Sequence, residues 1–273
     1  MKKFIKLLSI TALLLGLVAC SNGNSEPTED NIISISATLN PHATILEFAK
    51  PLLKEKGYDL EITVLDDYQV FNRALDSGDV LVNYFQHIPF FDQQIQDNGY
   101  DIVNVGGVHI EPFGFYSNTI TNTSELKEND TIIISNSVAD HGRTLAILEK
   151  AGIIELDPSV NKQVALTSDI TSNPLNLEFI EVKAELLYNA LENNEGALVA
   201  INGNYALANG LKPLEQAIIL EEGTSDNPYI NIVATKTENK DNPKVIALME
   251  VLKSEEVKQF IKDTYKGSVI SAE

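Results

Sequence analysis

Side chains that commonly carry out chemistry are scarce in this 273-residue chain, which has four histidines, two arginines and one cysteine. His109 and Glu111 are two residues apart, so on a strand both would point to the same face. They would supply only two of the four ligands of a structural zinc site, and such a pair is more typical of a hydrogen-bonded sheet edge. A metal-binding protein would need His42 and His87 to converge on the same point. We therefore expect no metal site and no cofactor, with metal binding kept as an alternative.

The usual signatures of catalysis and nucleotide binding do not occur in the sequence. It contains no GxGxxG, GxxxxGK[ST], HExxH or GxSxG motif. We also find no nucleophile with a plausible base beside it. The sequence therefore indicates a binding protein and not an enzyme. An enzyme with an unrecognised acid–base pair and a protein used for adhesion remain alternatives.

Arg143 is the candidate for holding an anion. The chain has 18 lysines but only two arginines, and Arg143 ends the segment Asp140-His141-Gly142-Arg143 at the start of a predicted helix. Arginine is favoured where a carboxylate must be held by two parallel hydrogen bonds, and a helix N-terminus also attracts anions. A solvated surface charge is the alternative interpretation.

Aromatic residues gather in the segment Tyr84–Phe91, which contains four of them together with His87. Tyr68 lies upstream, where a predicted strand gives way to a loop, a common place for binding residues. Together these side chains would form a slot for an apolar or thioether side chain, although plain core packing explains the segment about equally well. Farther along, Asn202 follows a predicted buried strand, either as a helix N-cap or as an amide that contacts a ligand.

The N-terminus has the organisation of a secretory leader. Lys2, Lys3 and Lys6 precede an apolar run at 7–19, which is too short to span a membrane comfortably. The run ends in Leu17-Val18-Ala19-Cys20, which resembles the lipobox of bacterial lipoproteins. We expect a signal peptide at 1–19, lipidation of Cys20 and a polar tether at 20–30. The body would then be extracytoplasmic and anchored to the cell membrane by lipid.

The net charge of the chain excludes one class of partner. Twenty Lys+Arg against 39 Asp+Glu give a formal charge of −19, which becomes −22 without the three leader lysines. A surface of this sign repels phosphate backbones, so we expect no nucleic acid partner.

Strand and helix patterns alternate along the body, which indicates an α/β fold with mainly parallel sheets. Strands are expected at 32–37, 61–65, 81–84, 100–105, 113–117, 131–135, 178–181, 196–201 and 229–235. Helices are expected at 41–56, with a kink or break at Pro51, and at 71–76, 89–97, 143–151, 184–193, 204–208 and 243–264.

Two polar interruptions, at 119–130 and 221–228, divide this pattern. They predict one lobe inserted into another, with lobe 1 at 31–115 plus 229–273 and lobe 2 at 116–228. Clefts between lobes are preferred ligand sites, so we expect the site there.

Several motifs, taken in order, resemble those of the methionine-binding lipoproteins, the substrate-binding subunits of methionine ABC importers. They are Pro41-His42-Ala43, Phe48–Asp59, Asp67-Tyr68, Phe85-Gln86-His87, His109–Pro112, Gly142-Arg143, Ile201–Ala206 and Asn227–Asn231. The resemblance runs from about Ile33 to Ile261. It implies a two-lobed periplasmic-binding-protein fold (type II-like), L-methionine or a related amino acid as ligand, and an ABC permease with a separate ATPase subunit as partner.

The resemblance also implies a ligand site whose residues are Tyr68, Phe85, His87, Phe90, Arg143, Asn202 and Asn231. The aromatic residues and the histidine would surround the ligand's side chain. The arginine would hold its carboxylate, and the two asparagines would bind its polar groups.

The chain departs from the family pattern in three places. Phe90 stands where the family usually has tyrosine, Phe71 replaces a proline that usually follows Asp-Tyr, and Ala139 and Asp140 replace a Thr-Asn pair. The added carboxylate would favour a ligand amine or repel a second carboxylate. These departures leave open whether the ligand is methionine, a related amino acid or a short methionine-containing peptide.

Overall fold

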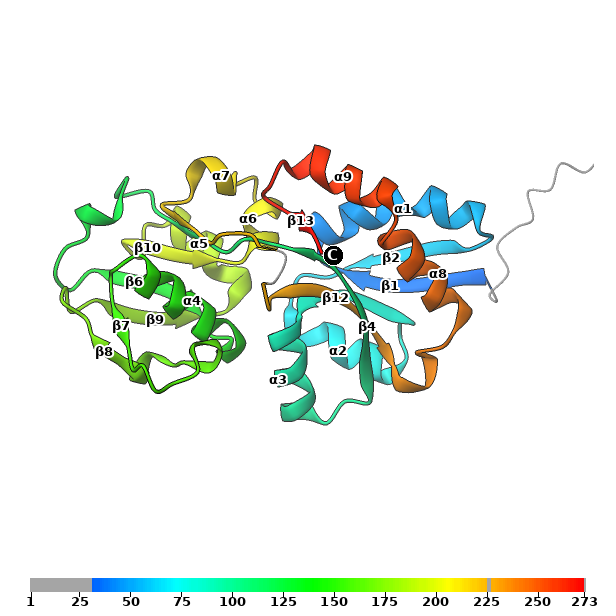
Figure 1. Cartoon of the computed structure of the whole chain (residues 1–273), viewed down its shortest axis with the longest axis horizontal. Helices are drawn as coiled ribbons and strands as arrows, with labels where there is room; N and C mark the ends of the chain where they lie inside the picture. The colour runs from blue at the N-terminus through cyan, green and yellow to red at the C-terminus, as the bar shows by residue number, and fades with distance from the viewer. Residues whose placement is uncertain (1–30, 225–226, 273) are drawn as a thin grey trace, which may run out of the picture.

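The computed structural model describes residues 31–224 and 227–272, which form two lobes side by side, each built around its own β-sheet (Figure 1). The expected signal peptide, Cys20 and the tether lie outside the described residues. Within the described ranges, none of the helices combines the length and the apolar character needed to cross a membrane.

The first lobe contains a six-stranded sheet in the order β13-β4-β12-β3-β1-β2. Its strands are β1 (Ile32–Ala37), β2 (Asp59–Val64), β3 (Val82–His87), β4 (Ile102–Ile110), β12 (Ile230–Lys236) and β13 (Ile270–Ser271). The strand β1 pairs in parallel with β2 and β3, whereas β12 runs antiparallel to β3 and β4. The sheet is therefore mixed, and the expectation of mainly parallel pairing fails along its β12 half.

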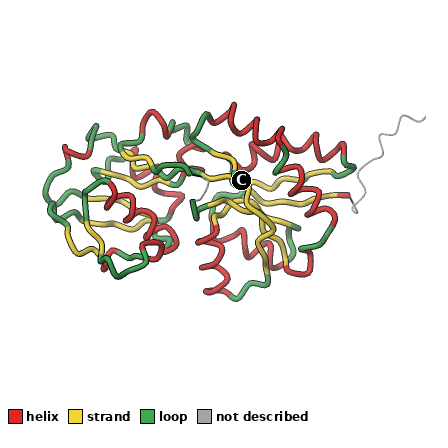
Figure 2. The backbone as a smooth tube through the Cα atoms, in the orientation of Figure 1, coloured by secondary structure: helices red, strands yellow, loops and turns green. Residues whose placement is uncertain are grey.

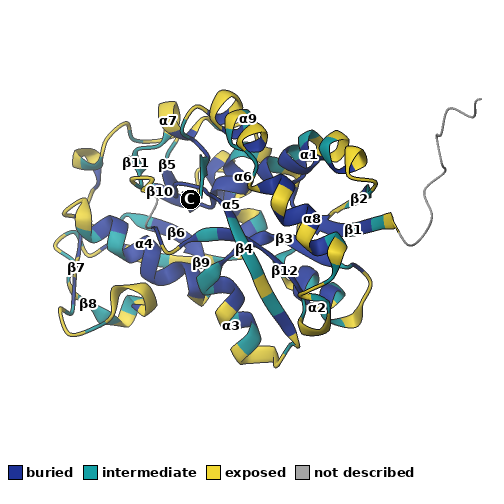
Figure 3. Cartoon of the chain, turned by 45° about the vertical axis from the view of Figure 1, so that its right-hand side comes forward, coloured by how far each residue is buried: buried dark blue, intermediate teal, exposed yellow. Residues whose placement is uncertain are grey.

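Helices cover both faces of the first sheet. One face packs against α1 (Thr44–Glu55), α8 (Pro243–Leu252) and α9 (Glu255–Tyr265), and the other against α2 (Tyr68–Ser77) and α3 (Ile88–Asn98). A π-helical turn, η2 (Leu39–Ala43), leads into α1. Figure 2 shows the strands inside and the helices outside. Figure 3 shows buried residues on the inner strands and on the inward sides of the helices, and exposed residues on the outer sides of the helices and in the loops.

The second lobe contains a five-stranded sheet in the order β11-β5-β10-β6-β9. Its strands are β5 (Gly114–Tyr116), β6 (Thr131–Ser135), β9 (Glu178–Val182), β10 (Leu198–Ile201) and β11 (Ile219–Leu220), and a separate pair joins β7 (Glu155–Leu156) to β8 (Ile170–Ser172). The core on one face includes α4 (Val138–Lys150), and the core on the other includes α5 (Leu187–Glu192) and α6 (Gly203–Ala208). Shorter helical segments complete the lobe: η3 (Thr123–Glu125), η4 (Lys162–Val164), η5 (Thr167–Asp169), η6 (Ala184–Leu186) and α7 (Pro213–Gln216); η7 (Thr237–Asn239) follows β12 in the first lobe.

The chain passes between the two sheets at two places. The first passage joins β4 to β5 and contains Glu111, and the second joins β11 to β12. Because β5 pairs with β10 and β11, the sheets change before Gly114, slightly ahead of the lobe boundary expected at 115/116. The other expected boundary, at 228/229, falls between β11 and β12.

Two expected helices are divided differently in the structure. The long helix at 243–264 is divided into α8 and α9, because Lys253 ends the first and Ser254 adopts an extended conformation. The Ser254 hydroxyl then accepts a hydrogen bond from the backbone N–H of Val257, which caps α9. Conversely, Pro51 does not divide α1, which continues from Thr44 to Glu55.

The helix that carries Arg143 begins at Val138, five residues before the predicted start at Arg143. Its N-cap is Ser137, and Asp140 lies in its first turn. Arg143 therefore lies in the second turn, away from the helix N-terminus, and the expected help of that terminus in anion binding is wrong. Gly142 is required beside it, because a Cβ atom there would lie 2.4 Å from the backbone of Gln163.

Candidate functional site

A small cavity lies between the lobes, where strands β3 and β12 of the first lobe, the first passage and helices α4 and α6 of the second lobe meet. Its lining residues are Tyr68, Phe85, Gln86, His87, Phe90, Glu111, Asp140, Arg143, Asn202, Gly203, Asn204 and Asn231. The structure thus brings all seven residues of the predicted site to one cavity. Their contact with a ligand stays a prediction.

One wall of the cavity is aromatic. Tyr68 opens α2, Phe85 lies on β3 and Phe90 lies in the first turn of α3, and their ring centroids are 5.7–5.9 Å apart. Phe71 stacks on Phe85 from behind at 4.0 Å. The same rings therefore serve as core and as wall, so both interpretations of this segment hold. Burial raises the pKa of Tyr68 well above its usual value, and its neutral hydroxyl donates a hydrogen bond to Asn204 Oδ1 at 2.5 Å.

His87 and Asp140 connect the two lobes across the cavity. His87 ends β3 and caps α3, where its Nδ1 accepts a hydrogen bond from the backbone N–H of Phe90. The proton of the ring is therefore on Nε2, which donates to Asp140 Oδ1 at 2.9 Å. Burial opposes ionisation of Asp140, but the hydrogen bonds from His87 and Asn202 and the charge interactions with His87 and Arg143 together outweigh it, so the pKa of the carboxyl is lowered. Asp140 is thus a buried anion in the cavity wall.

Asn202 lines the cavity and carries a buried acceptor. It is the N-cap residue of α6 by position, but its side chain makes no capping hydrogen bond. Instead, its Nδ2 donates to Asp140 Oδ2 at 3.2 Å. Its Oδ1 is buried and has no hydrogen-bond partner among the described residues. Of the two interpretations of Asn202, the structure thus favours an amide available to a ligand.

Arg143 is buried and held on several sides. Its Nε and Nη2 donate to the carboxylate of Glu221, and Nη2 also donates to the carbonyl of Glu111 at 2.7 Å. The guanidinium carbon lies 4.4 Å from the ring centroid of Tyr229 and 5.3 Å from that of Phe113. The expectation that Arg143 holds a ligand carboxylate by two parallel hydrogen bonds needs refinement, because Glu221 already occupies the Nε/Nη2 edge of the guanidinium group. The nitrogen Nη1 makes no hydrogen bond within the described ranges.

Asn231 lies on β12 between the two histidine-bearing strands, paired with His87 of β3 and His109 of β4. Its Oδ1 is 3.1 Å from Nε2 of His42, which is held on the other side by the Thr38 hydroxyl at 2.7 Å from Nδ1. Its Nδ2 makes no hydrogen bond within 31–224 and 227–272, so this donor is left for the cavity that Asn231 lines.

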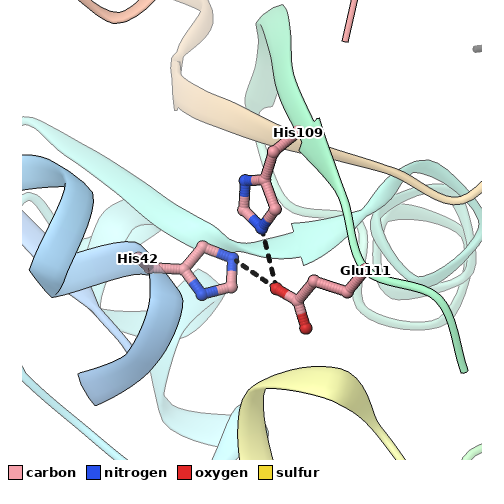
Figure 4. Close-up of side chains that lie close together, drawn as sticks. All are labelled: His42, His109 and Glu111. Carbon is pink, nitrogen blue, oxygen red and sulfur yellow. Dashed lines mark hydrogen bonds and ion pairs between the residues drawn. The ribbon is translucent and has the colours of Figure 1, made fainter. Parts of the chain in front are cut away.

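His42, His109 and Glu111 converge below the cavity, and Figure 4 shows both rings directed at one oxygen of the carboxylate. His109 Nε2 is 2.8 Å and His42 Nε2 is 3.6 Å from Glu111 Oε1. Burial lowers the pKa of both histidines to about 3, so both rings are neutral. Burial also raises the pKa of Glu111, more than the neighbouring His42 and Arg143 lower it.

This cluster fits a hydrogen-bond network better than a metal site. Each ring nitrogen already has a partner, since Thr38 and Tyr84 bond the two Nδ1 atoms and Asn231 and Glu111 bond the two Nε2 atoms. The cluster does offer three potential protein ligands, but zinc would need lone pairs on both Nε2 atoms in place of these hydrogen bonds. His87, required by the metal-binding alternative, is bonded to Asp140 instead. The absence of a metal from the protein stays a prediction.

Several residues at the cavity were not predicted to belong to the site, and two of them, Glu111 and Glu221, carry charge. Glu111 appeared in the sequence only as the partner of His109, and Glu221 only as the first residue of a polar interruption. Glu111 lines the cavity, and Gly203 makes this possible because a Cβ atom there would lie 2.6 Å from the Glu111 Cβ. For Glu111, the available signal in the sequence was Gly203, a glycine that opens a helix next to a buried strand. No local signal marks Glu221.

The sequence and the fold both have close counterparts among known proteins. A family model described as NlpA lipoprotein matches residues 33–273. The chain belongs to the NlpA lipoprotein family. This NlpA-family chain is 47% identical over 271 residues to the methionine-binding lipoprotein MetQ of Bacillus subtilis (strain 168), with 97% of this chain and 98% of that protein covered.

Solved structures of family members share the two-lobed fold. A crystal structure of a methionine-binding lipoprotein from Bacillus subtilis is 48% identical, with a TM-score of 0.87 over 90% of this chain and 99% of that chain. A nutrient-binding protein from Burkholderia cenocepacia, solved bound to methionine, is 34% identical, with a TM-score of 0.83 over 88% of this chain and 100% of that chain. The predicted α/β, two-lobed periplasmic-binding-protein architecture is confirmed.

Proposed function

We propose that this NlpA-family lipoprotein binds L-methionine in the cavity between its lobes and delivers it to an ABC permease that is driven by a separate ATPase subunit. The observation that carries the proposal is the polarity of the cavity. It offers hydrogen-bond donors on one side, acceptors on another and an aromatic wall, which together match a zwitterionic amino acid with an apolar side chain.

The donors suit the carboxylate of an α-amino acid. Arg143 lines the cavity, and although Glu221 pairs with its Nε and Nη2, its Nη1 makes no hydrogen bond among the described residues; Asn231 offers Nδ2. Hydrogen bonds in which the donor or the acceptor is charged are about twice as strong as neutral ones. A carboxylate held between Arg143 and Asn231 would therefore contribute most of the polar binding energy.

The acceptors suit the ammonium group. Asn202 Oδ1 is buried without a partner among the described residues, and Asp140 beside it is a buried carboxylate with a lowered pKa. A buried unpaired acceptor costs about 1–3 kcal/mol, and a ligand ammonium placed there would remove that cost. Asp140, the residue that departs from the family pattern, thus supports a ligand amine.

The aromatic wall suits the thioether. Tyr68, Phe85 and Phe90 form an apolar surface, with Phe71 behind it. Burying each methylene of a ligand contributes about 0.8 kcal/mol, and a sulfur beside an aromatic ring adds about 0.3–1.5 kcal/mol. An amide side chain such as that of glutamine would instead lose its water there without compensation.

The named relatives support methionine as the ligand over a peptide, since one is called methionine-binding and another was solved with methionine bound.

Lobe closure would couple binding to delivery. Tyr68, Phe85 and Phe90 belong to the first lobe, whereas Arg143 and Asn202 belong to the second. A ligand that contacts both groups stabilises the closed arrangement over the open one. The closed form would then dock on the permease. The protein binds its cargo and performs no chemistry on it.

The experiment is mass spectrometry of small molecules released by denaturing the unlipidated body, followed by calorimetric titration of the stripped protein. We expect methionine to co-purify and to bind more tightly than norleucine or glutamine. Glutamine binding more tightly than methionine would refute the aromatic-wall argument. Release of a peptide would replace the amino acid by the peptide alternative, and a heat of binding with zinc alone would favour metal binding.

A further inference from the structure

We propose that His42, held in place by Thr38, is a positioning residue that fixes the side-chain amide of Asn231 with its NH₂ group toward the cavity. The inference rests on the proposed function, because it explains how the cavity recognises a ligand carboxylate. His42 itself does not line the cavity. It acts through Asn231, at a distance of one hydrogen bond.

Thr38, His42 and Asn231 are joined by a chain of two hydrogen bonds that leads from the interior to the cavity. The Thr38 hydroxyl is 2.7 Å from His42 Nδ1, and His42 Nε2 is 3.1 Å from Asn231 Oδ1. The three residues are 2%, 0% and 6% exposed, so water does not compete for these bonds. Each hydrogen-bonded group therefore constrains the next.

The position of the proton on His42 decides which groups donate and which accept along these two hydrogen bonds. A neutral imidazole has one donor and one acceptor nitrogen, so two arrangements are conceivable. In one, the Thr38 hydroxyl donates to Nδ1 and Nε2 donates to Asn231 Oδ1. In the other, Nδ1 donates to the Thr38 hydroxyl and Nε2 accepts from a reversed Asn231 amide.

Glu111 selects the first arrangement. Its Oε1 lies 3.6 Å from His42 Nε2, and a carboxylate oxygen favours a proton on the nitrogen that it faces. His109 donates to the same oxygen at 2.8 Å, which keeps the carboxylate in place. His42 is edge-on to the rings of Tyr84 and His109, with centroids 4.5 and 4.8 Å away, so the imidazole has no room to turn.

The direction of the Asn231 amide matters for the ligand. With Oδ1 engaged by His42, Nδ2 is the atom left for the cavity, and it donates to a carboxylate oxygen. A reversed amide would present an oxygen to that carboxylate, and two acceptors repel each other. Asparagine side chains reverse readily unless a network fixes them. His42 thus removes the wrong orientation before the ligand arrives.

The first test observes the proton of His42 directly in the wild-type body. Long-range ¹H–¹⁵N correlation spectra distinguish the two neutral tautomers of histidine, and the chain has only four histidines to assign. We expect His42 to carry its proton on Nε2 between pH 5 and 8. A proton on Nδ1 would overturn the proposal, whatever the ligand proves to be.

The second test measures binding. We expect His42→Leu to weaken L-methionine by about tenfold to a hundredfold, the usual cost of losing an oriented hydrogen bond to a charged group. His42→Gln, whose amide can still donate toward Asn231, should restore most of the affinity. L-Methioninol, which has no carboxylate, should bind the wild type and both variants within about threefold of one another.

A double-mutant cycle separates positioning from general damage. In the Asn231→Ala background, His42→Leu should lower the affinity for L-methionine by less than about threefold, because no amide remains to be oriented. Additive losses, or equal losses of methionine and methioninol, would refute the positioning role. If His42→Leu does not fold, Thr38→Val takes its place in the cycle, with additivity again the refuting result. Failure of the wild type to bind methionine would count against the proposed function. The tautomer measured for His42 would still support or overturn the present inference.

Discussion

Replacing Asp140 by asparagine tests whether the cavity is built to hold an ammonium group. In the structure Asp140 accepts two hydrogen bonds, from His87 Nε2 at 2.9 Å and from Asn202 Nδ2 at 3.2 Å. An asparagine side chain has one oxygen, which would stay with the histidine. Its NH₂ group would then face the NH₂ group of Asn202.

Two donors cannot bond each other, so the Asn202 amide should reverse and offer its oxygen to the new asparagine. That oxygen is the buried acceptor without a partner that we assign to the ligand ammonium. Asp140→Asn thus removes a carboxylate and redirects an acceptor in one step. Hydrogen bonds to charged groups are worth about 1.5–3 kcal/mol, so the dissociation constant of L-methionine should rise about 10- to 150-fold.

The assay compares L-methionine with 4-(methylthio)butanoate, which keeps the carboxylate and the thioether but has no amine. Asp140→Asn should weaken the binding of L-methionine selectively. The affinity for the desamino acid should stay within about threefold of the wild-type value. Asp92→Asn, which removes the same charge from an exposed position on α3, is the matched control and should change neither affinity. Equal weakening of both ligands, or tighter binding of methionine, would refute the assignment of the ammonium to this part of the cavity.

The remaining predictions concern charge, pH and the anchor. Arg143→Ala should weaken L-methionine by about 2–5 kcal/mol in calorimetry, whereas Arg73→Ala, at an exposed position, should be nearly silent; equal effects would mean that Arg143 acts through net charge. The pKa values of His42 and His109 are lowered by burial to about 3, so their contribution to stability is complete above about pH 6.5 and is lost as the pH falls toward 3. Each of these two histidines should lower the free energy of unfolding by roughly 2 kcal/mol as the pH falls from 6.5 to 5. Glu111, whose pKa is raised by burial, partly offsets this loss. Urea titrations that show no loss of stability at pH 5 would contradict this prediction. Cys20→Ser should release the body from membranes or leave an unprocessed precursor in fractionated cells, and a variant that is still processed and membrane-bound would exclude lipidation at this residue.

Features that depend on local pattern were predictable from the sequence. The strand at 32–37 was placed correctly, because alternating apolar residues report which face of a strand is buried. The aromatic segment and the arginine were found because their residue types are distinctive. These signals need no knowledge of the rest of the fold.

Features that depend on residues distant in sequence were not predictable. The start of α4 was set too late, because Val138 and Ala139 carry no periodic signal and the Ser137 side chain makes no capping hydrogen bond. Glu221 reaches Arg143 across 78 residues, and nothing in its neighbours indicates that contact. The antiparallel pairing of β12 is likewise set by the return of the chain from the second lobe. Tertiary packing decides all three.

A crystal structure of the unlipidated body with L-methionine would test the central claim most directly. We predict that the carboxylate contacts Arg143 Nη1 and Asn231 Nδ2, that the ammonium contacts Asn202 Oδ1 and Asp140, and that the sulfur lies against the aromatic wall. A ligand in the reverse orientation, with its ammonium toward Arg143, would contradict the account. So would methionine bound outside this cavity.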